Sequence, residues 1–130
     1  MVSREGIESF LIQTELDFEE VEEGMWIVHP QKSEEGASPV VVVSYAPPVV
    51  VLRSDLRRAP EDDSAALGLY RKLLELNATD LIHGAYGLED GKVILTDTLE
   101  LEDLDFSEFR ASLESIALAV TSHLPHLTTD

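Results

Sequence analysis

The histidines are the first side chains to consider for chemistry, because imidazole exchanges protons near neutral pH and binds metal ions. The chain has four of them. His29 and His83 fall in separate predicted strands, and nothing in the sequence brings them together. His123 and His126 have a spacing that could place both on one helix face, but Pro125 lies between them. We expect structural or surface roles for all four, and leave open whether His123 and His126 bind a metal.

Carboxylates form two dense clusters, one between residues 19 and 23 and one between residues 100 and 105. Paired carboxylates can catalyse glycoside or phosphoester hydrolysis. Such a site also needs aromatic or basic side chains that hold the substrate, and the chain has one tryptophan and three tyrosines. No calcium-loop pattern surrounds either cluster, so we expect solvated acidic surfaces.

Motifs for nucleophilic catalysis and phosphate binding are missing from the sequence. The glycine-containing run 84–87 lies inside a predicted strand, which is the wrong context for a phosphate loop. The chain has no cysteine, which removes disulfides, thiolate zinc sites and cysteine nucleophiles. We predict that the protein is not an enzyme and uses no cofactor. The alternative is a small acidic-site or metal-dependent enzyme that uses carboxylates with His29 or His83.

The charge balance is strongly acidic, with 9 lysines and arginines against 26 aspartates and glutamates, a net charge of −17. An excess of this size repels phosphate backbones, so nucleic-acid binding is not expected. Arg53, Arg57 and Arg58 form a cationic cluster. We expect this cluster to neutralise nearby acids such as Asp55 and Glu61, although it could also pair with an acidic partner.

The length of 130 residues and the hydrophobic content of 44% predict one domain over residues 1–130 with a real core. No apolar run approaches the roughly 18 residues of a membrane span. The first residues lack the cationic and long apolar segments of a secretion signal. We expect a cytoplasmic protein without membrane association.

The first expected elements are a short helix capped by Ser3 and an antiparallel strand pair. The pair covers residues 17–23 and 25–29, with a turn at Gly24. Two valine-rich runs follow, and Pro47-Pro48 separates them. Because proline cannot donate to a sheet, these prolines indicate a turn, a bulge or an exposed edge. The runs form either two strands or one broken strand.

A second helix is predicted from Glu61 to about Leu76, started by Pro60 and stopped by Asn77. A helix lying on one sheet needs an apolar stripe of roughly 100°. This helix has apolar residues over about half of its circumference. Its apolar residues are Ala66, Leu67, Leu69, Tyr70, Leu73, Leu74 and Leu76. Another helix or a second subunit must cover the extra flank.

Two further strands, residues 81–88 and 92–99, are joined at Asp90-Gly91, a pair typical of tight hairpins. The last helix begins near Asp105, in a capping box with Glu108, and ends at Pro125. The predicted order is α-ββ-β(β)-α-ββ-α. This is an α+β domain with an antiparallel sheet of about five strands and three helices.

Apolar spacing motifs between residues 73 and 124 resemble the YbjN-type family of bacterial regulators. They lie at residues 73–78, 83–88, 93–95, 97–99 and 104–106. The resemblance implies a fold similar to type III secretion chaperones. It also implies a small acidic cytoplasmic protein, frequently dimeric, that binds other proteins through its sheet and helices. No binding residue of the family transfers to a single position of this chain.

We therefore expect a non-catalytic protein-binding module, chaperone-like or a regulatory adaptor, that acts as a homodimer. The wide apolar face of the second helix and the edge expected near Pro47-Pro48 motivate this. The predicted partner or dimer interface is Val49, Val51, Leu67, Tyr70 and Leu74, and the interpretation that all five are core residues stays open. A roadblock- or profilin-like dimerisation platform with the same element order is a third possibility. Whether the helices lie on one face or on both faces of the sheet distinguishes this platform from the chaperone-like fold.

Overall fold

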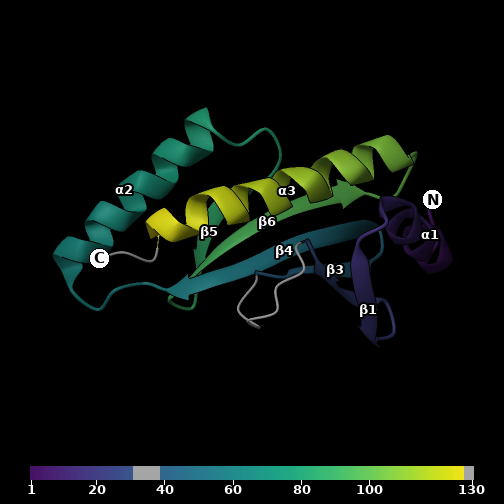
Figure 1. The fold of residues 1–130 in the computed structure, drawn as a ribbon, viewed down its shortest axis with the longest axis horizontal. Coiled ribbons are helices and arrows are strands. Elements are labelled where there is room, and N and C mark those ends of the chain that lie inside the picture. Colours follow the sequence, from purple (N-terminus) through teal and green to yellow (C-terminus); the bar gives the residue numbers. More distant parts are fainter. Residues whose placement is uncertain (31–38, 128–130) are drawn as a thin grey trace.

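The computed structural model describes residues 1–30 and 39–127. Three helices and six strands follow one another along the chain in the order α-ββββ-α-ββ-α (Figure 1). Their bounds are α1 (Arg4–Thr14), β1 (Asp17–Glu22), β2 (Met25–His29), β3 (Val41–Ala46), β4 (Val49–Arg58), α2 (Asp63–Thr79), β5 (Ala85–Glu89), β6 (Lys92–Glu100) and α3 (Phe106–Leu127). The predicted α+β class and element order are confirmed.

The strands form one antiparallel sheet in the order β1-β2-β3-β4-β6-β5. It has six strands rather than about five, because the two valine-rich runs become separate strands. Pro47 and Pro48 form the turn between them, and Ala46 pairs with Val49 on either side. The exposed edge expected at these prolines is wrong, because β3 and β4 are both interior strands. The edges of the sheet are β1 and β5.

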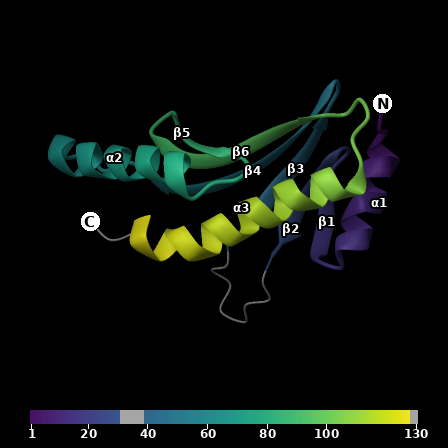
Figure 2. The ribbon, with the colours of Figure 1, turned by 90° about the horizontal axis from the view of Figure 1, so that it is seen from above.

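Helices α1 and α3 cover the same face of the sheet (Figure 2). They contact each other through Phe10, whose ring centroid lies 5.6 Å from that of Phe109. On the sheet side, Trp26 and Val28 are fully buried, as their alternation predicts. Within the described ranges, no helix is both long enough and apolar enough to cross a lipid bilayer.

Helix α2 lies at the β5 end of the sheet, and its far end projects beyond the strands (Figures 1 and 2). Both predicted ends of this helix are wrong. Asp62 caps its start by accepting a hydrogen bond from the backbone N–H of Ala65 at 2.8 Å, so Pro60 and Glu61 precede the helix. The helix continues past Asn77 to Thr79, because the Asn77 side chain bonds to a strand and does not cap the helix.

Strand β5 begins at Ala85, so the predicted start at residue 81 is wrong. Gly84 enters the strand with φ +84°, a conformation that breaks the ladder and favours glycine. The hairpin at Asp90-Gly91 is confirmed, with φ values of +48° and +78° that suit a tight turn.

Helix α3 begins with the predicted capping box. Asp105 accepts from the N–H of Glu108 at 2.8 Å, and Glu108 accepts from the N–H of Asp105 at 3.3 Å. The predicted end at Pro125 is wrong, because the helix continues to Leu127. Two cationic side chains donate to its last carbonyls, Lys72 to His126 and Arg57 to Leu127. These bonds hold the final turn even though proline removes one helical N–H.

Candidate binding surfaces

The apolar face of α2 divides into a buried flank and an exposed flank. Leu69 and Leu73 pack into the hydrophobic core. Leu67 and Leu74 point to solvent, with exposed fractions of 61% and 69%, and Tyr70 between them is half-buried. The extra width of the predicted apolar face is therefore the part of α2 that the described chain does not cover.

Two neighbouring hollows connect this flank to the edge of the sheet. One, of about 460 Å³, lies along α2 itself and is lined by Leu67, Tyr70, Arg71, Leu74, Glu75 and Ala78. The other, of about 170 Å³, lies between α2 and β5 and includes Leu88, which is 50% exposed. Tyr70 and Leu74 line both hollows. We call the exposed group Leu67, Tyr70, Leu74 and Leu88 the α2–β5 surface.

A side chain from α2 forms hydrogen bonds with part of the outer edge of β5. Asn77 Oδ1 accepts from the backbone N–H of Tyr86 at 2.7 Å, and Asn77 Nδ2 donates to the Tyr86 carbonyl at 3.2 Å. Leu88 presents its backbone groups at the same edge, because alternate residues of a strand direct them to the same side. In the part of the chain that the structure describes, no side chain pairs with the backbone of Leu88 as Asn77 does with Tyr86.

Val49 and Val51 lie on β4, away from the α2–β5 surface. They alternate with Val50 and Leu52, which are buried in the core beneath the helices. Both valines therefore face the opposite side of the sheet and remain partly exposed. The five residues predicted as an interface thus fall on two surfaces, one on α2 and one on the far face of the sheet.

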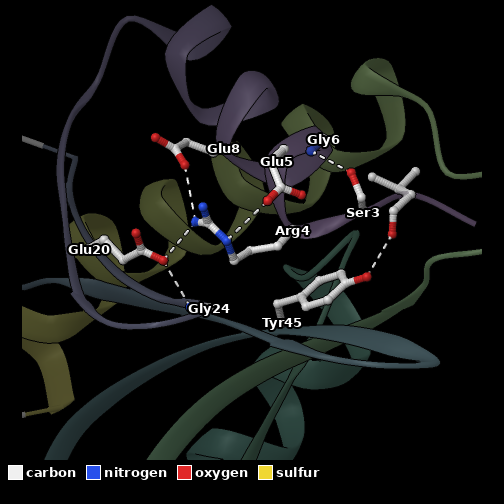
Figure 3. A network of polar contacts seen from close by, with 9 residues as sticks. Ser3, Arg4, Glu5, Gly6, Glu8, Glu20, Gly24 and Tyr45 are labelled. Carbon is white, nitrogen blue, oxygen red and sulfur yellow. Dashed lines mark hydrogen bonds and ion pairs between the residues drawn. The ribbon is translucent and has the colours of Figure 1, made fainter.

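One acidic cluster is tied to the start of the chain through Arg4 (Figure 3). Arg4 donates to Glu20 at 2.8 Å and to Glu8 at 3.1 Å, and Glu20 also accepts from the N–H of Gly24 at 2.9 Å. Partial burial acts to lower the pKa of Arg4, but Glu20, Glu5 and Glu8 together outweigh it and raise the pKa. This arrangement fastens α1 to the β1–β2 hairpin.

The predicted neutralising role of the basic cluster is confirmed for Arg53. Its guanidinium donates to Asp55 at 2.7 Å and to Glu89 at 3.0 Å. The hydrogen bond to Asp55 is the main cause that raises the pKa of Arg53, against the opposing effect of burial. Arg57 differs, because it donates to the carbonyl of Leu127 at 2.6 Å.

His123 is part of a chain of polar contacts with Tyr86 and Asp80. Its Nδ1 lies 2.6 Å from the hydroxyl of Tyr86, and its Nε2 lies 3.4 Å from a carboxylate oxygen of Asp80. Burial is the main cause that raises the pKa of Tyr86 well above its ordinary range, and the charge of Asp80 adds to it. A phenol held neutral in this way orients the imidazole and joins β5 to α3.

His83 lines the same hollow as Asp80 and His123, whereas His29 and His126 lie elsewhere. His83 precedes β5 and His29 is on β2, four strand positions away or roughly 19 Å at about 4.8 Å per strand. His126 lines a separate hollow with Arg57 and Lys72. Among the residues described, no three histidine, aspartate or glutamate side chains are grouped to hold a metal ion. Neither acidic cluster of the enzyme alternative, residues 19–23 or 100–105, lines the hollow that contains His83.

The CesT_Tir_1 family model matches residues 2–129. The chain belongs to this family of type III secretion chaperones. Comparison with curated proteins finds no match. The family membership agrees with the expected resemblance to YbjN-type proteins and secretion chaperones.

Solved structures show that the CesT_Tir_1 chain has a type III secretion chaperone-like fold. A chain of the ExoU–SpcU heterodimer from Pseudomonas aeruginosa is 18% identical with a TM-score of 0.68, over 94% of this chain and 98% of that one. YbjN from E. coli is 15% identical with a TM-score of 0.66, over 95% and 92%. A chain of the ExsC–ExsE complex is 17% identical with a TM-score of 0.64, over 98% and 97%.

Three features of this CesT_Tir_1 chain were not predicted from its sequence. Asn77 was expected to stop a helix, but its side chain bonds to the backbone of Tyr86. One hint of such a role was present in the sequence, because asparagine is a poor helix former and this one lies in an otherwise helical stretch. The contact between Tyr86 and His123 joins residues 37 positions apart, and no local pattern indicates it. Ile82, 87% exposed, was assigned to a strand that begins three residues later.

Proposed function

We propose that the chain is a non-catalytic protein-binding module, chaperone-like or a regulatory adaptor, that acts as a homodimer in the cytoplasm. The proposed module is one domain that spans residues 1–130. Its binding is to protein, without a cofactor and without nucleic acid or membrane as a ligand. Membership of the CesT_Tir_1 family supports this class of function.

Relatives of similar fold support a protein partner. Structures similar to the chain include the ExoU–SpcU heterodimer, the HopA1–SchA chaperone–effector complex and the ExsC–ExsE complex. Each of these is an assembly of two different proteins. A protein partner for this chain is the proposal that follows from such relatives.

The observation that carries the homodimer is the α2–β5 surface. Leu67 and Leu74 are large apolar side chains on the same face of α2, about two turns apart, and both are more than half exposed. Leu88 extends the apolar surface to the outer edge of β5, which pairs with no other strand of the described chain. A twofold contact that places α2 of one copy against the same surface of another would cover all three side chains at once. Contiguous exposed apolar side chains are typical of such interfaces.

The second predicted patch, Val49 and Val51, is proposed as a partner surface rather than part of the dimer contact. The two valines lie on an interior strand, so they can be reached only from the open face of the sheet. A client segment that lies across the strands can contact both side chains. This separates the five predicted interface residues into a dimer group on α2 and a client group on β4.

Light scattering coupled to gel filtration tests the dimer. The natural chain is expected at twice its 14.4 kDa monomer mass, and the double variant Leu67→Asp with Leu74→Asp at the monomer mass. The matched control is Ile12→Asp, which places the same charge on an exposed apolar position of α1. A natural chain that stays monomeric at all concentrations would overturn the homodimer. Equal dissociation by the Ile12 variant would overturn its assignment to α2.

Protein binding itself is tested by capture from the native organism, with the Leu67 and Leu74 variant and a Val49→Asp with Val51→Asp variant in parallel. A partner lost only from the β4 variant supports the client group. Capture that is indifferent to both pairs would reject both assigned surfaces.

A further inference from the structure

A separate groove lies between α3 and the connector that joins α2 to β5. It has a volume of about 470 Å³. Its α3 lining includes Ala111, Glu114, Ser115, Leu118, Ala119 and Ser122, and its connector lining includes Asp80, Ile82 and His83. The α3 positions recur at steps of three and four, so they share one helix face. That face covers eleven residue steps, or about 16 Å at 1.5 Å per residue.

Large apolar side chains stand exposed on both walls of this groove. Ile82 on the connector is 87% exposed and Leu118 on α3 is 68% exposed. Leu118 lies on the opposite side of α3 from core residues such as Leu113 and Ile116. Ala111 on the same lining face is small, which lets a visiting backbone approach the helix closely. We call this feature the α3 groove.

The connector is bound to α3 at two points, which keeps the α3 groove open without a ligand. The backbone N–H of His83 donates to Ser115 Oγ at 3.3 Å. Asp80 Oδ2 lies 3.4 Å from His123 Nε2, and the other nitrogen of that ring contacts Tyr86. The groove is therefore preformed, and a ligand does not have to order its walls.

The charged side chains along the α3 groove are acidic. Asp80 is at one wall and Glu114 at the other, and among the described residues that line the groove there is no lysine or arginine. Glu114 has an exposed ion pair with Arg110 at 3.8 Å, which a stronger cationic partner can replace. His83 and His123 are the other titratable groups there. This local excess is part of a net charge of −17 for the whole chain.

We propose that the α3 groove binds a basic amphipathic segment of a protein partner, about three helical turns long. Its apolar side chains pack on Ile82 and Leu118, and its lysine or arginine residues face Asp80 and Glu114. A second copy of this chain is the wrong occupant, because it would bring another acidic surface against those carboxylates. The inference rests on the proposed protein-binding role but not on the homodimer, since the α2–β5 surface shares none of these residues.

Three synthetic 14-residue peptides serve as probes: an amphipathic leucine–lysine helix, a scrambled peptide of the same composition, and a leucine–glutamate helix. Titration into the ¹⁵N-labelled chain reports the binding site by amide chemical-shift changes. The leucine–lysine helix is expected to shift residues 80–83 and 111–122 and to bind at least tenfold more tightly than the other two peptides. Its affinity should fall as ionic strength rises.

Leu118→Asp is the decisive variant, with Ile12→Asp as its matched control. Each variant adds one negative charge at an exposed apolar position, so attraction that depends on charge alone would strengthen equally in both. The groove predicts an affinity loss of at least tenfold for Leu118→Asp and no loss for Ile12→Asp. Folding of each variant is checked by its amide spectrum.

Several outcomes would overturn this inference. Equal binding of the scrambled peptide would show general attraction to an acidic protein. Shifts confined to α2 and β5 would move the peptide to the α2–β5 surface. Shifts at 111–122 on simple concentration of the chain, without peptide, would assign the groove to a second copy. By contrast, a Leu67→Asp and Leu74→Asp variant that becomes monomeric but still binds the peptide would support the inference, because the groove would then function without the homodimer.

Discussion

Asn77 of α2 and Tyr86 of β5 are joined by two hydrogen bonds that imitate the pairing of one strand with the next. The Asn77 amide accepts at 2.7 Å from the Tyr86 N–H and donates at 3.2 Å to the Tyr86 carbonyl. An unpaired strand edge invites association with another chain. The Asn77 side chain occupies the backbone groups of Tyr86 at the outer edge of β5, and it also holds α2 beside that strand. The same residue therefore determines where the exposed flank of α2 lies and leaves the edge at Leu88 for another partner.

Asn77→Ala is expected to lower the free energy of unfolding by about 1–3 kcal/mol, because it leaves two partly buried backbone groups of Tyr86 without partners. Urea unfolding followed by circular dichroism measures the change. Thr79→Ala is the control, since it removes an exposed hydrogen bond to the carbonyl of Glu75 from the same helix. An Asn77 variant no less stable than the Thr79 variant would show that the edge contact contributes nothing.

Local patterns were enough to predict most of this fold. Trp26 and Val28 alternate with less buried neighbours, Asp105 and Glu108 form their capping box, and Asp90-Gly91 turns its hairpin. Each of these depends on residues close in sequence, where propensity and spacing carry the information.

The errors arise where distant residues compete with a local signal. Asn77 would end an isolated helix, but Tyr86 takes its side chain and the helix continues. Pro125 would stop an isolated helix, but Lys72 from another element caps the turn that follows. The two candidate surfaces also differ in whether local sequence predicts them. The excess apolar width of α2 could be read from spacing, whereas the α3 groove depends on a connector whose place no sequence pattern indicates.

Tyr86 is expected to ionise at higher pH than a free tyrosine, because burial and the charge of Asp80 raise its pKa. An unfolded tyrosine ionises near pH 10. The stabilisation due to neutral Tyr86 is therefore complete below about pH 10 and is lost as pH rises toward the folded pKa. Absorbance at 295 nm should show one late step that Tyr86→Phe removes. A natural chain whose tyrosines all titrate together near pH 10 would contradict the burial of this phenol.

Substitution by alanine should lower the free energy of unfolding at Gly84 and raise it at Gly68. A Cβ at Gly84 would lie 2.8 Å from the carbonyl oxygen of Thr96, and φ there is +84°. Gly84→Ala should cost more than about 2 kcal/mol of unfolding free energy from strain and contact together. Gly68 lies inside α2 with no atom within 4 Å of the added Cβ, so Gly68→Ala should stabilise by roughly 0.5–1 kcal/mol. Thermal unfolding measures both, and a stable Gly84 variant would mean that β5 can enter the sheet by another path.

The homodimer through α2 predicts that thermal stability depends on protein concentration. Unfolding of a dimer releases two chains, so a tenfold rise in concentration stabilises the folded state by about 1.4 kcal/mol and should raise Tm by roughly 3 °C for two chains of this size. The Leu67→Asp and Leu74→Asp double variant should lose this dependence, and Ile12→Asp should keep it. Scanning calorimetry over a hundredfold range of concentration makes the measurement. A Tm of the natural chain that does not change across that range would exclude a dimer coupled to folding, and a dependence retained by the double variant would place the contact away from these two leucines.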